Sequence, residues 1–304
     1  MKKPVYLPLL LCLSLIVSLQ GQDKKAFSWI NPLTKAEEKA ALGLSHSTFR
    51  SEIIGKDVGY CVFTPPGYDE QQNQSLSYPV IYMLHGGRPG DESKFSDKIP
   101  YVWKAIKAGD LLPTIVVLVN GGPVSHYNVP GRPDARGKDI FTDELIPLID
   151  KTYRTVAIRE GRGLQGYSQG GRAVARIGFG HPDMFSHLII GSAGATTEKR
   201  IQDNHGEENE NLVFAPGDDM WTHTENYANH FSQRFPVKVL LHVGDEMDNN
   251  HEGNIAYDQF LTDLEIEHNF IIIPDQKHSS SAYVRIHDKI LAFQNDAFRK
   301  SLSR

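Results

Sequence analysis

A serine flanked by glycines is the residue in this chain best placed to do chemistry. Ser168 lies in the string Gly166-Tyr167-Ser168-Gln169-Gly170, between a short strand-like segment at 163–165 and a helix-forming segment at 172–176. A serine on a sharp strand-to-helix turn projects its hydroxyl from the sheet, and glycines nearby let neighbouring backbone pass close to it. The helix start also places backbone N–H groups near any oxyanion formed there. This setting predicts a nucleophile that attacks a carbonyl carbon.

Two later segments can supply the base and the orienting acid that a serine nucleophile requires. His278 follows the predicted strand at 270–273, so we expect it in a loop at the carboxyl end of that strand. Asp245 and Asp248 both follow the predicted strand at 237–243, and either carboxylate could face the histidine. We prefer Asp248 as the acid. The order serine, aspartate, histidine along the chain is that of the α/β-hydrolase architecture.

An oxyanion formed at Ser168 needs N–H donors, and two places in the chain can provide them. Gln169 gives one through its backbone, as the residue after the nucleophile. The string His85-Gly86-Gly87-Arg88 directly follows the predicted strand at 80–84, and we assign the second donor to the amide of Gly87 or Arg88. The residues that we expect to contact the substrate are His85, Tyr167 and Trp221.

The sequence carries none of the common metal or cofactor patterns. His251-Glu252 has no second histidine four residues on, and no glycine-rich dinucleotide or phosphate-binding string occurs. With only 2 cysteines, the chain has no thiolate cluster for zinc. We therefore predict no cofactor and no metal.

Short apolar runs alternate with helical patterns along the chain, which predicts an α/β fold with a mostly parallel central sheet flanked by helices. Several runs are continuous, as expected for strands that are buried on both faces. Residues 48–54 and the next strand are separated by Gly55-Lys56-Asp57, which predicts an antiparallel pair at the sheet edge. The predicted strands are 60–63, 80–84, 115–119, 163–165, 188–190, 237–243 and 270–273, and the predicted helices lie around 141–149, 257–264 and 283–297.

We expect a single domain preceded by two short segments. Residues 1–21 combine two lysines with an apolar stretch, which predicts a signal peptide for export. Residues 22–45 form a polar N-terminal segment, and residues 46–304 form the α/β domain. Within the domain, the polar, loop-rich stretch 196–235 interrupts the alternation and predicts a lid or pocket wall, with a plain surface insertion as the alternative.

The composition excludes several classes of partner. The 304 residues include 32 Lys+Arg and 37 Asp+Glu, for a net charge of −5, with 40% hydrophobic residues. A mildly acidic chain without a basic run does not attract nucleic acid or anionic lipid. Removal of the leader leaves Cys61 without a partner for a disulfide. We expect an exported protein, periplasmic or extracellular, with no nucleic-acid partner and no membrane association after the leader is removed.

The chain resembles the esterase group of α/β hydrolases that contains esterase D, feruloyl and acetylxylan esterases of carbohydrate esterase family one, enterochelin esterases and mycolyltransferases. The resemblance implies a Ser-His-Asp acyl hydrolase and, by position, the triad Ser168, Asp248 and His278. Members often have Gly-x-x-Asp at the acid, whereas the segment from Gly244 to Asp248 is one residue longer, so Asp245 stays open as the alternative. The segments that carry the resemblance are 64–68, 78–87, 144–150, 153–155, 166–170 and 181–185.

These observations together predict an exported serine carboxylester hydrolase with a small-molecule or polysaccharide ester as its partner. We expect feruloyl or acetyl esters of plant cell-wall xylan as substrates. A siderophore esterase of the enterochelin type or an acyltransferase of the same group is one alternative. A non-catalytic carbohydrate-binding protein on a hydrolase fold is an alternative of another class.

Overall fold

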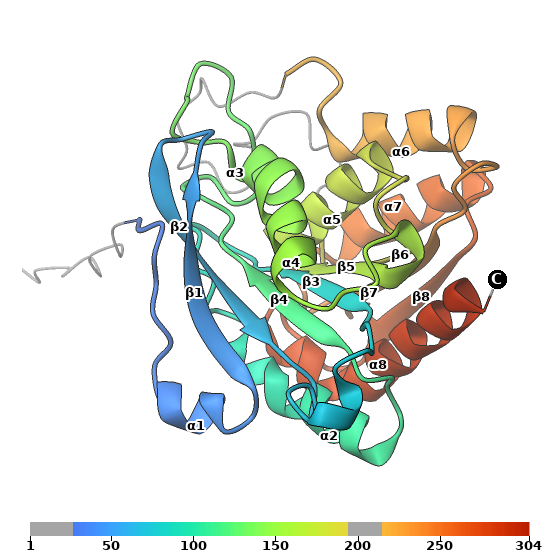
Figure 1. The fold of residues 1–304 in the computed structure, drawn as a ribbon. Helices are drawn as coiled ribbons and strands as arrows, with labels where there is room; N and C mark the ends of the chain where they lie inside the picture. Colours follow the sequence, from blue (N-terminus) through green and yellow to red (C-terminus); the bar gives the residue numbers. More distant parts are fainter. Residues whose placement is uncertain (1–26, 194–214, 304) are drawn as a thin grey trace, which may run out of the picture.

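An eight-stranded sheet forms the centre of the computed structural model, which describes residues 27–193 and 215–303 (Figure 1). In chain order the strands are β1 (Leu44–Ser51), β2 (Lys56–Phe63), β3 (Val80–Leu84), β4 (Ile115–Val119), β5 (Arg162–Tyr167), β6 (His187–Gly191), β7 (Lys238–Gly244) and β8 (His268–Ile273). Their spatial order is β1-β2-β4-β3-β5-β6-β7-β8. β1 with β2 and β2 with β4 pair antiparallel, and the other neighbours pair parallel. The predicted mostly parallel α/β sheet is confirmed.

Helices cover both faces of the sheet (Figure 1). The first face is covered by α4 (Ile146–Thr152), α5 (Gln169–Gly180), α6 (Met220–His230) and α7 (His251–Asp263), and the second by α2 (Ile99–Ala108) and α8 (Ser281–Leu302). The shorter helical segments are α1 (Ala36–Ala40), η1 (Gln71–Asn73), η2 (Ser96–Lys98), α3 (Gly137–Asp139), the π-helical η3 (Ile140–Leu145) and η4 (Arg159–Gly161).

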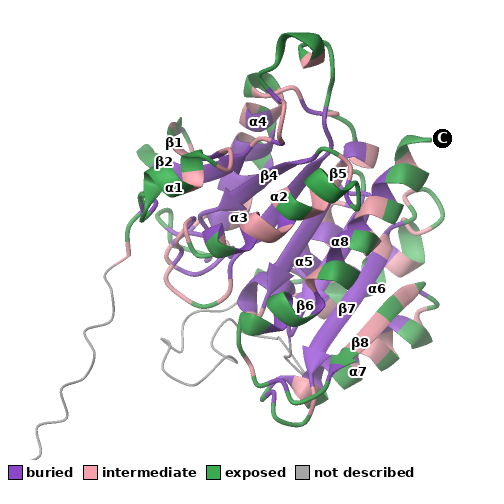
Figure 2. Cartoon of the chain, turned by 90° about the horizontal axis from the view of Figure 1, so that it is seen from below, coloured by how far each residue is buried: buried purple, intermediate pink, exposed green. Residues whose placement is uncertain are grey.

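Strands β3 and β4 are apolar at every position because both of their faces are buried. In β3, Tyr82 and Leu84 belong to the core on the first face, whereas Ile81 and Met83 belong to the core on the second. Burying one such side chain contributes roughly 1.5–3 kcal/mol. Strands β3, β4 and β6 are buried along their whole length, while the helices expose their outer sides (Figure 2). Packing in the two cores holds the strands in place, and with them the loops at the strand ends where the candidate site residues lie.

The described part of the 196–235 stretch differs from the prediction. Residues 220–230 form helix α6, which begins at an Asp219 cap whose carboxylate accepts a hydrogen bond from the Thr222 amide at 2.9 Å. Met220 and Tyr227 are buried in the first-face core, while most other side chains of the helix are polar. Because α6 has so few apolar residues, its sequence shows no clear helical repeat of apolar positions. Residues 196–214 lie outside the described residues, so the lid stays a prediction.

The described part of the N-terminal segment packs onto the domain. Trp29 and Leu33 are buried, and β1 already begins at Leu44. The buried Glu92 carboxylate accepts hydrogen bonds from the Asn31 amide at 2.7 Å and from the Asn31 side chain at 3.0 Å. Residues 27–45 are therefore anchored to the domain, and the predicted signal peptide at 1–21 lies outside the described residues.

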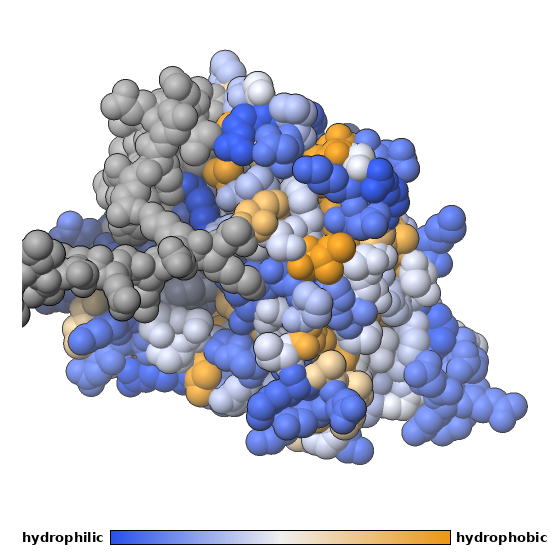
Figure 3. Space-filling view, turned by 90° about the vertical axis from the view of Figure 1, so that its left-hand side faces the viewer, coloured by the Kyte–Doolittle hydropathy of each residue, from blue (hydrophilic) through white to orange (hydrophobic). Residues whose placement is uncertain are grey.

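The surface of the described residues is mainly polar. On the side shown in Figure 3, apolar side chains appear as small separate groups among polar ones. Across residues 27–193 and 215–303, no helix has both the length and the apolar character needed to cross a bilayer.

Candidate active site

Ser168 occupies a tight turn between β5 and α5. Its backbone angles are φ 58° and ψ −121°, a conformation that residues other than glycine rarely adopt. Two residues on, an added Cβ at Gly170 would lie 2.1 Å from the carbonyl oxygen of Leu84. Glycine at 170 therefore lets the start of α5 pack directly against β3. The turn places Ser168 at the carboxyl edge of the sheet.

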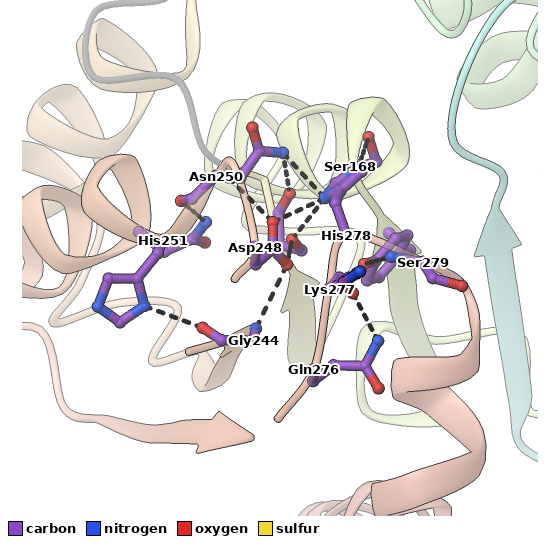
Figure 4. A network of polar contacts seen from close by, with 12 residues as sticks. Ser168, Gly244, Asp248, Asn250, His251, Gln276, Lys277, His278 and Ser279 are labelled. Carbon is purple, nitrogen blue, oxygen red and sulfur yellow. Dashed lines mark hydrogen bonds and ion pairs between the residues drawn. The ribbon is translucent and has the colours of Figure 1, made fainter. Parts of the chain in front are cut away.

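His278 reaches the serine from the loop between β8 and α8 (Figure 4). Its Nε2 lies 2.9 Å from the Ser168 Oγ. The Tyr167 ring lies against the imidazole, with centroids 5.2 Å apart and an interplanar angle of 27°. The Tyr167 hydroxyl accepts a hydrogen bond from the Ser279 amide at 2.9 Å. These contacts show Tyr167 supporting the histidine loop, and the substrate contact that the sequence suggested for it stays a prediction.

Asp248 meets His278 from the loop after β7. Its Oδ1 lies 2.9 Å from the His278 Nδ1 (Figure 4). A carboxylate can only accept hydrogen bonds, so this contact places the proton of the neutral imidazole on Nδ1. The Nε2 lone pair then faces the Ser168 hydroxyl. The three side chains therefore form a line along which the serine proton can move to the histidine.

The carboxyl group of Asp248 is held ionised although it is buried. Desolvation raises its pKa, but hydrogen bonds from His278, Ser192 and the Asn250 amide outweigh that effect and hold the pKa below its usual value. Asp245 has other contacts: its carboxylate accepts hydrogen bonds from the amides of Met247 at 3.2 Å and Asp275 at 2.5 Å. Of the two candidate acids, Asp248 is therefore the one that faces the base.

The loop after β3 lies against the serine turn. An added Cβ at Gly86 would lie 2.7 Å from the Tyr167 carbonyl oxygen and 3.0 Å from the Ser168 Cβ. Gly87, the next residue, has φ 67°, in the left-handed region that favours glycine. Gln169 opens α5 on the other side of the serine. The loop with Gly87 and Arg88 thus lies beside the nucleophile, where the sequence predicted the oxyanion donors.

His85 lies inside the protein and supports this loop. Its Nε2 accepts hydrogen bonds from the amides of Gly121 at 3.0 Å and Asp91 at 3.3 Å, and its Nδ1 lies 3.2 Å from the Gly86 carbonyl oxygen. Burial lowers the pKa of His85 to about 3, so the ring is neutral at pH 7. Both ring nitrogens of His85 are therefore hydrogen-bonded to backbone groups. The structure therefore does not place His85 where the sequence predicted it, against a substrate.

Among the described contacts, none joins Trp221 to a residue of the triad. Its ring packs against Phe260 and Tyr257 of α7, with centroid distances of 4.7 Å and 5.2 Å. The side chain joins the first-face core. It anchors α6 to α7, and the stacking on a substrate ring that the sequence suggested stays a prediction.

Two residues that the sequence did not suggest complete the surroundings of the acid. Asn250 donates its backbone N–H to the Asp248 Oδ1 at 2.9 Å. Ser192, directly after β6, places its Oγ 2.6 Å from the Asp248 Oδ2. The sequence could have suggested Ser192 only through its position, because it follows a strand, β6, that lies beside β5 in the sheet. No motif marks that position.

No metal centre is present in the described part of the chain. Among residues 27–193 and 215–303, no three His, Cys, Asp or Glu side chains come together in a way that could hold a metal ion. Cys61 is buried as a free thiol in β2.

A family model and several curated relatives match this chain. The model of the esterase family, described as "Putative esterase", matches residues 51–259. An endo-1,4-beta-xylanase/feruloyl esterase of Xylanibacter ruminicola is 30% identical over 166 residues, which are 51% of this chain and 22% of the relative. This chain thus spans about a fifth of the length of that relative.

Solved structures show the same fold. A ferulic acid esterase aligns with a TM-score of 0.68 and 20% identity, covering 84% of this chain and 98% of that chain. S-formylglutathione hydrolase of Staphylococcus aureus aligns with a TM-score of 0.67 and 13% identity, covering 82% and 97%. At these identities the likeness establishes the α/β-hydrolase fold. Since the family model covers most of the chain, this protein belongs to the esterase family, a family of carboxylic ester hydrolases.

Proposed function

We propose that this protein hydrolyses carboxylic esters through an acyl-enzyme on Ser168. The Ser168 Oγ attacks the ester carbonyl carbon while the His278 Nε2 takes the hydroxyl proton. The bond to the leaving alcohol breaks as His278 gives that proton to the alcohol oxygen. Water then attacks the acyl-enzyme with His278 again as the base, which releases the acid and restores the serine.

One observation carries this proposal: the chain of short contacts from nucleophile to base to acid. The Ser168 Oγ lies 2.9 Å from the His278 Nε2, and the His278 Nδ1 lies 2.9 Å from the Asp248 Oδ1. Both distances are within hydrogen-bonding reach, as proton transfer requires. Asp248 then stabilises the imidazolium that forms when His278 takes the proton.

The amides of Gln169 and of Gly87 or Arg88 are the proposed oxyanion donors. Gln169 begins α5, where backbone N–H groups are not used by the helix itself. The loop with Gly87 packs against the serine turn through Gly86. One such donor contributes about 3 kcal/mol to the stabilisation of the transition state.

The proposed substrates are feruloyl or acetyl esters of plant cell-wall polysaccharide. Support comes from the relative named an endo-1,4-beta-xylanase/feruloyl esterase, which shares 30% identity with this chain. Export also belongs to the proposal and rests on the lysines and apolar stretch of residues 1–21. An exported esterase would meet polysaccharide outside the cell.

The test compares the wild type with Ser168→Ala on p-nitrophenyl acetate and methyl ferulate. We expect kcat to fall by at least about a thousandfold in Ser168→Ala, because the nucleophile is lost. Ser75→Ala, which changes an exposed serine, serves as the control and should keep the wild-type rate. Equal rates for Ser168→Ala and the wild type would overturn the mechanism. A panel of feruloyl, acetyl-sugar and catecholate esters then tests the substrate class.

A further inference from the structure

A second serine contacts both the acid and the base of the proposed triad. The Ser192 Oγ lies 2.6 Å from the Asp248 Oδ2 and 3.0 Å from the His278 Nδ1. Ser192 directly follows β6 and is completely buried. Its hydroxyl takes no part in the proposed proton transfers. The contacts with Asp248 and His278 therefore indicate that the Ser192 hydroxyl has a role other than proton transfer.

The direction of these hydrogen bonds follows from the protons that are available. The ionised carboxylate of Asp248 can only accept, so the hydroxyl proton of Ser192 points to the Asp248 Oδ2. An oxygen lone pair of Ser192 then faces the His278 Nδ1. The Asp248 Oδ1 also faces Nδ1, at 2.9 Å. Two acceptors at Nδ1 keep the proton on that nitrogen, which leaves Nε2 free to accept the Ser168 proton.

The backbone of Ser192 is fixed in an unusual conformation. Its φ is 44°, in the left-handed region. The Ser192 amide donates to the His242 carbonyl oxygen at 2.6 Å, and the Ser192 carbonyl oxygen accepts from the Asn250 side chain at 2.8 Å. A backbone conformation of this kind persists only where the surroundings enforce it, and such residues cluster at active sites. The ends of β6 and β7 are thus tied together around Asp248.

We propose that Ser192 is a positioning residue that orients the Asp248 carboxylate and fixes the tautomer of His278. This inference rests on the proposed function, because it concerns the same triad. Without the hydroxyl, Asp248 keeps its contact with His278, but Oδ2 loses its closest donor and Nδ1 loses its second acceptor. Ser192 acts through these two residues, so its loss slows the chemistry and leaves substrate binding unchanged.

The chain offers a matched control at the other end of β6. Ser186 directly precedes that strand, is buried, and places its Oγ 3.0 Å from the Nδ1 of the buried His187. Ser186→Ala therefore removes the same kind of serine–histidine contact away from the triad. Ser192→Gly accompanies Ser192→Ala, because glycine also removes the hydroxyl but tolerates the positive φ.

The kinetic experiment measures kcat and KM of these variants with p-nitrophenyl acetate. We expect kcat to fall about tenfold to a hundredfold in both Ser192 variants, with KM within about twofold of the wild type. Ser186→Ala should keep kcat within about twofold. A loss confined to Ser192→Ala, or an equal loss in Ser186→Ala, would contradict a role for the Ser192 hydroxyl.

A spectroscopic measurement tests the same role without turnover. We expect the ¹H–¹⁵N signal of the His278 Nδ1 proton to shift and to exchange faster with water in both Ser192 variants, and to stay unchanged in Ser186→Ala. An unchanged signal together with an unchanged kcat would overturn the proposal. If the wild type hydrolyses no ester but the signal responds to the Ser192 variants, the positioning contact stands and the proposed function fails.

Discussion

At the residue scale, two aspartates three positions apart have different surroundings. Asp248 is buried and contacts His278, whereas Asp245 accepts hydrogen bonds only from backbone amides in the described contacts. We expect Asp248→Asn to lower kcat by about 10⁴-fold, because an amide can favour the wrong tautomer of the base. Asp245→Asn should keep kcat within about threefold, since the Asp245 carboxylate contacts no triad side chain. Steady-state kinetics of both variants on one ester decide between the two acids. The opposite ranking would assign the role to Asp245.

The serine, histidine and aspartate could be predicted because each follows a recognisable strand. The carboxyl ends of parallel strands meet at one edge of the sheet, so residues distant in sequence converge there. Ser192 also follows a strand, but the string Gly191-Ser192-Ala193 matches no motif, and its role depends on where its hydroxyl points. The sequence suggested that His85 contacts the substrate, because the direction of a side chain cannot be inferred from its position in a loop. Its burial appears only in the fold.

At the element scale, α6 is held by an aromatic contact with α7. Trp221 packs on Phe260 and Tyr257, and it is only partly buried. We expect Trp221→Ala to lower the free energy of unfolding by about 2 kcal/mol, less than the loss of a fully buried aromatic side chain because Trp221 is only partly buried. KM for p-nitrophenyl acetate should stay unchanged. Urea denaturation and steady-state kinetics measure the two quantities.

The control for this variant is Ile158→Ala, which truncates a side chain that is 54% exposed. It should change the free energy of unfolding by less than about 0.5 kcal/mol. A large rise in KM for Trp221→Ala without a loss of stability would instead place Trp221 in the substrate site.

Which elements could be predicted depended on how they are buried. Strands such as 80–84 and 115–119 are continuous apolar runs because both of their faces are covered, and these bounds match β3 and β4. Helices α2 and α6 were missed. The apolar positions of α6 are few and lie among polar residues, whereas α2 is amphipathic and has a proline in its first turn, a position where proline is well tolerated, so its pattern was available and was overlooked. For α6, packing on the sheet outweighs the weak local pattern.

At the scale of the whole molecule, four buried histidines make stability depend on pH, and burial holds the pKa of one of them, His126, well below its usual value. Burial lowers the pKa of His85 and His187 to about 3 and that of His242 to about 4. In the unfolded chain these groups take up protons below about pH 6.5, whereas in the folded protein they stay neutral down to these lower values. The unfolded state therefore binds more protons in that window. Stability present above pH 6.5 is lost as the pH falls toward 4.

We expect the free energy of unfolding to be lower at pH 5 than at pH 7.5. Each of the four buried histidines can contribute up to about 1.4 kcal/mol per pH unit within the window. His187→Gln should reduce this pH dependence, while His230→Gln, which changes an exposed histidine, should leave it unchanged. Urea denaturation at the two pH values measures the effect. Equal stability at both would show that the buried histidines do not govern acid sensitivity.

The central claim is that Ser168 becomes an activated nucleophile when the strand ends bring His278 and Asp248 to it. The most direct measurement is peptide mass spectrometry after reaction with a fluorophosphonate, which bonds covalently to activated serines. The account predicts one adduct on the peptide that contains Ser168, and strongly slowed labelling in His278→Ala. Labelling of another residue, or no labelling of the folded wild-type protein, would contradict it.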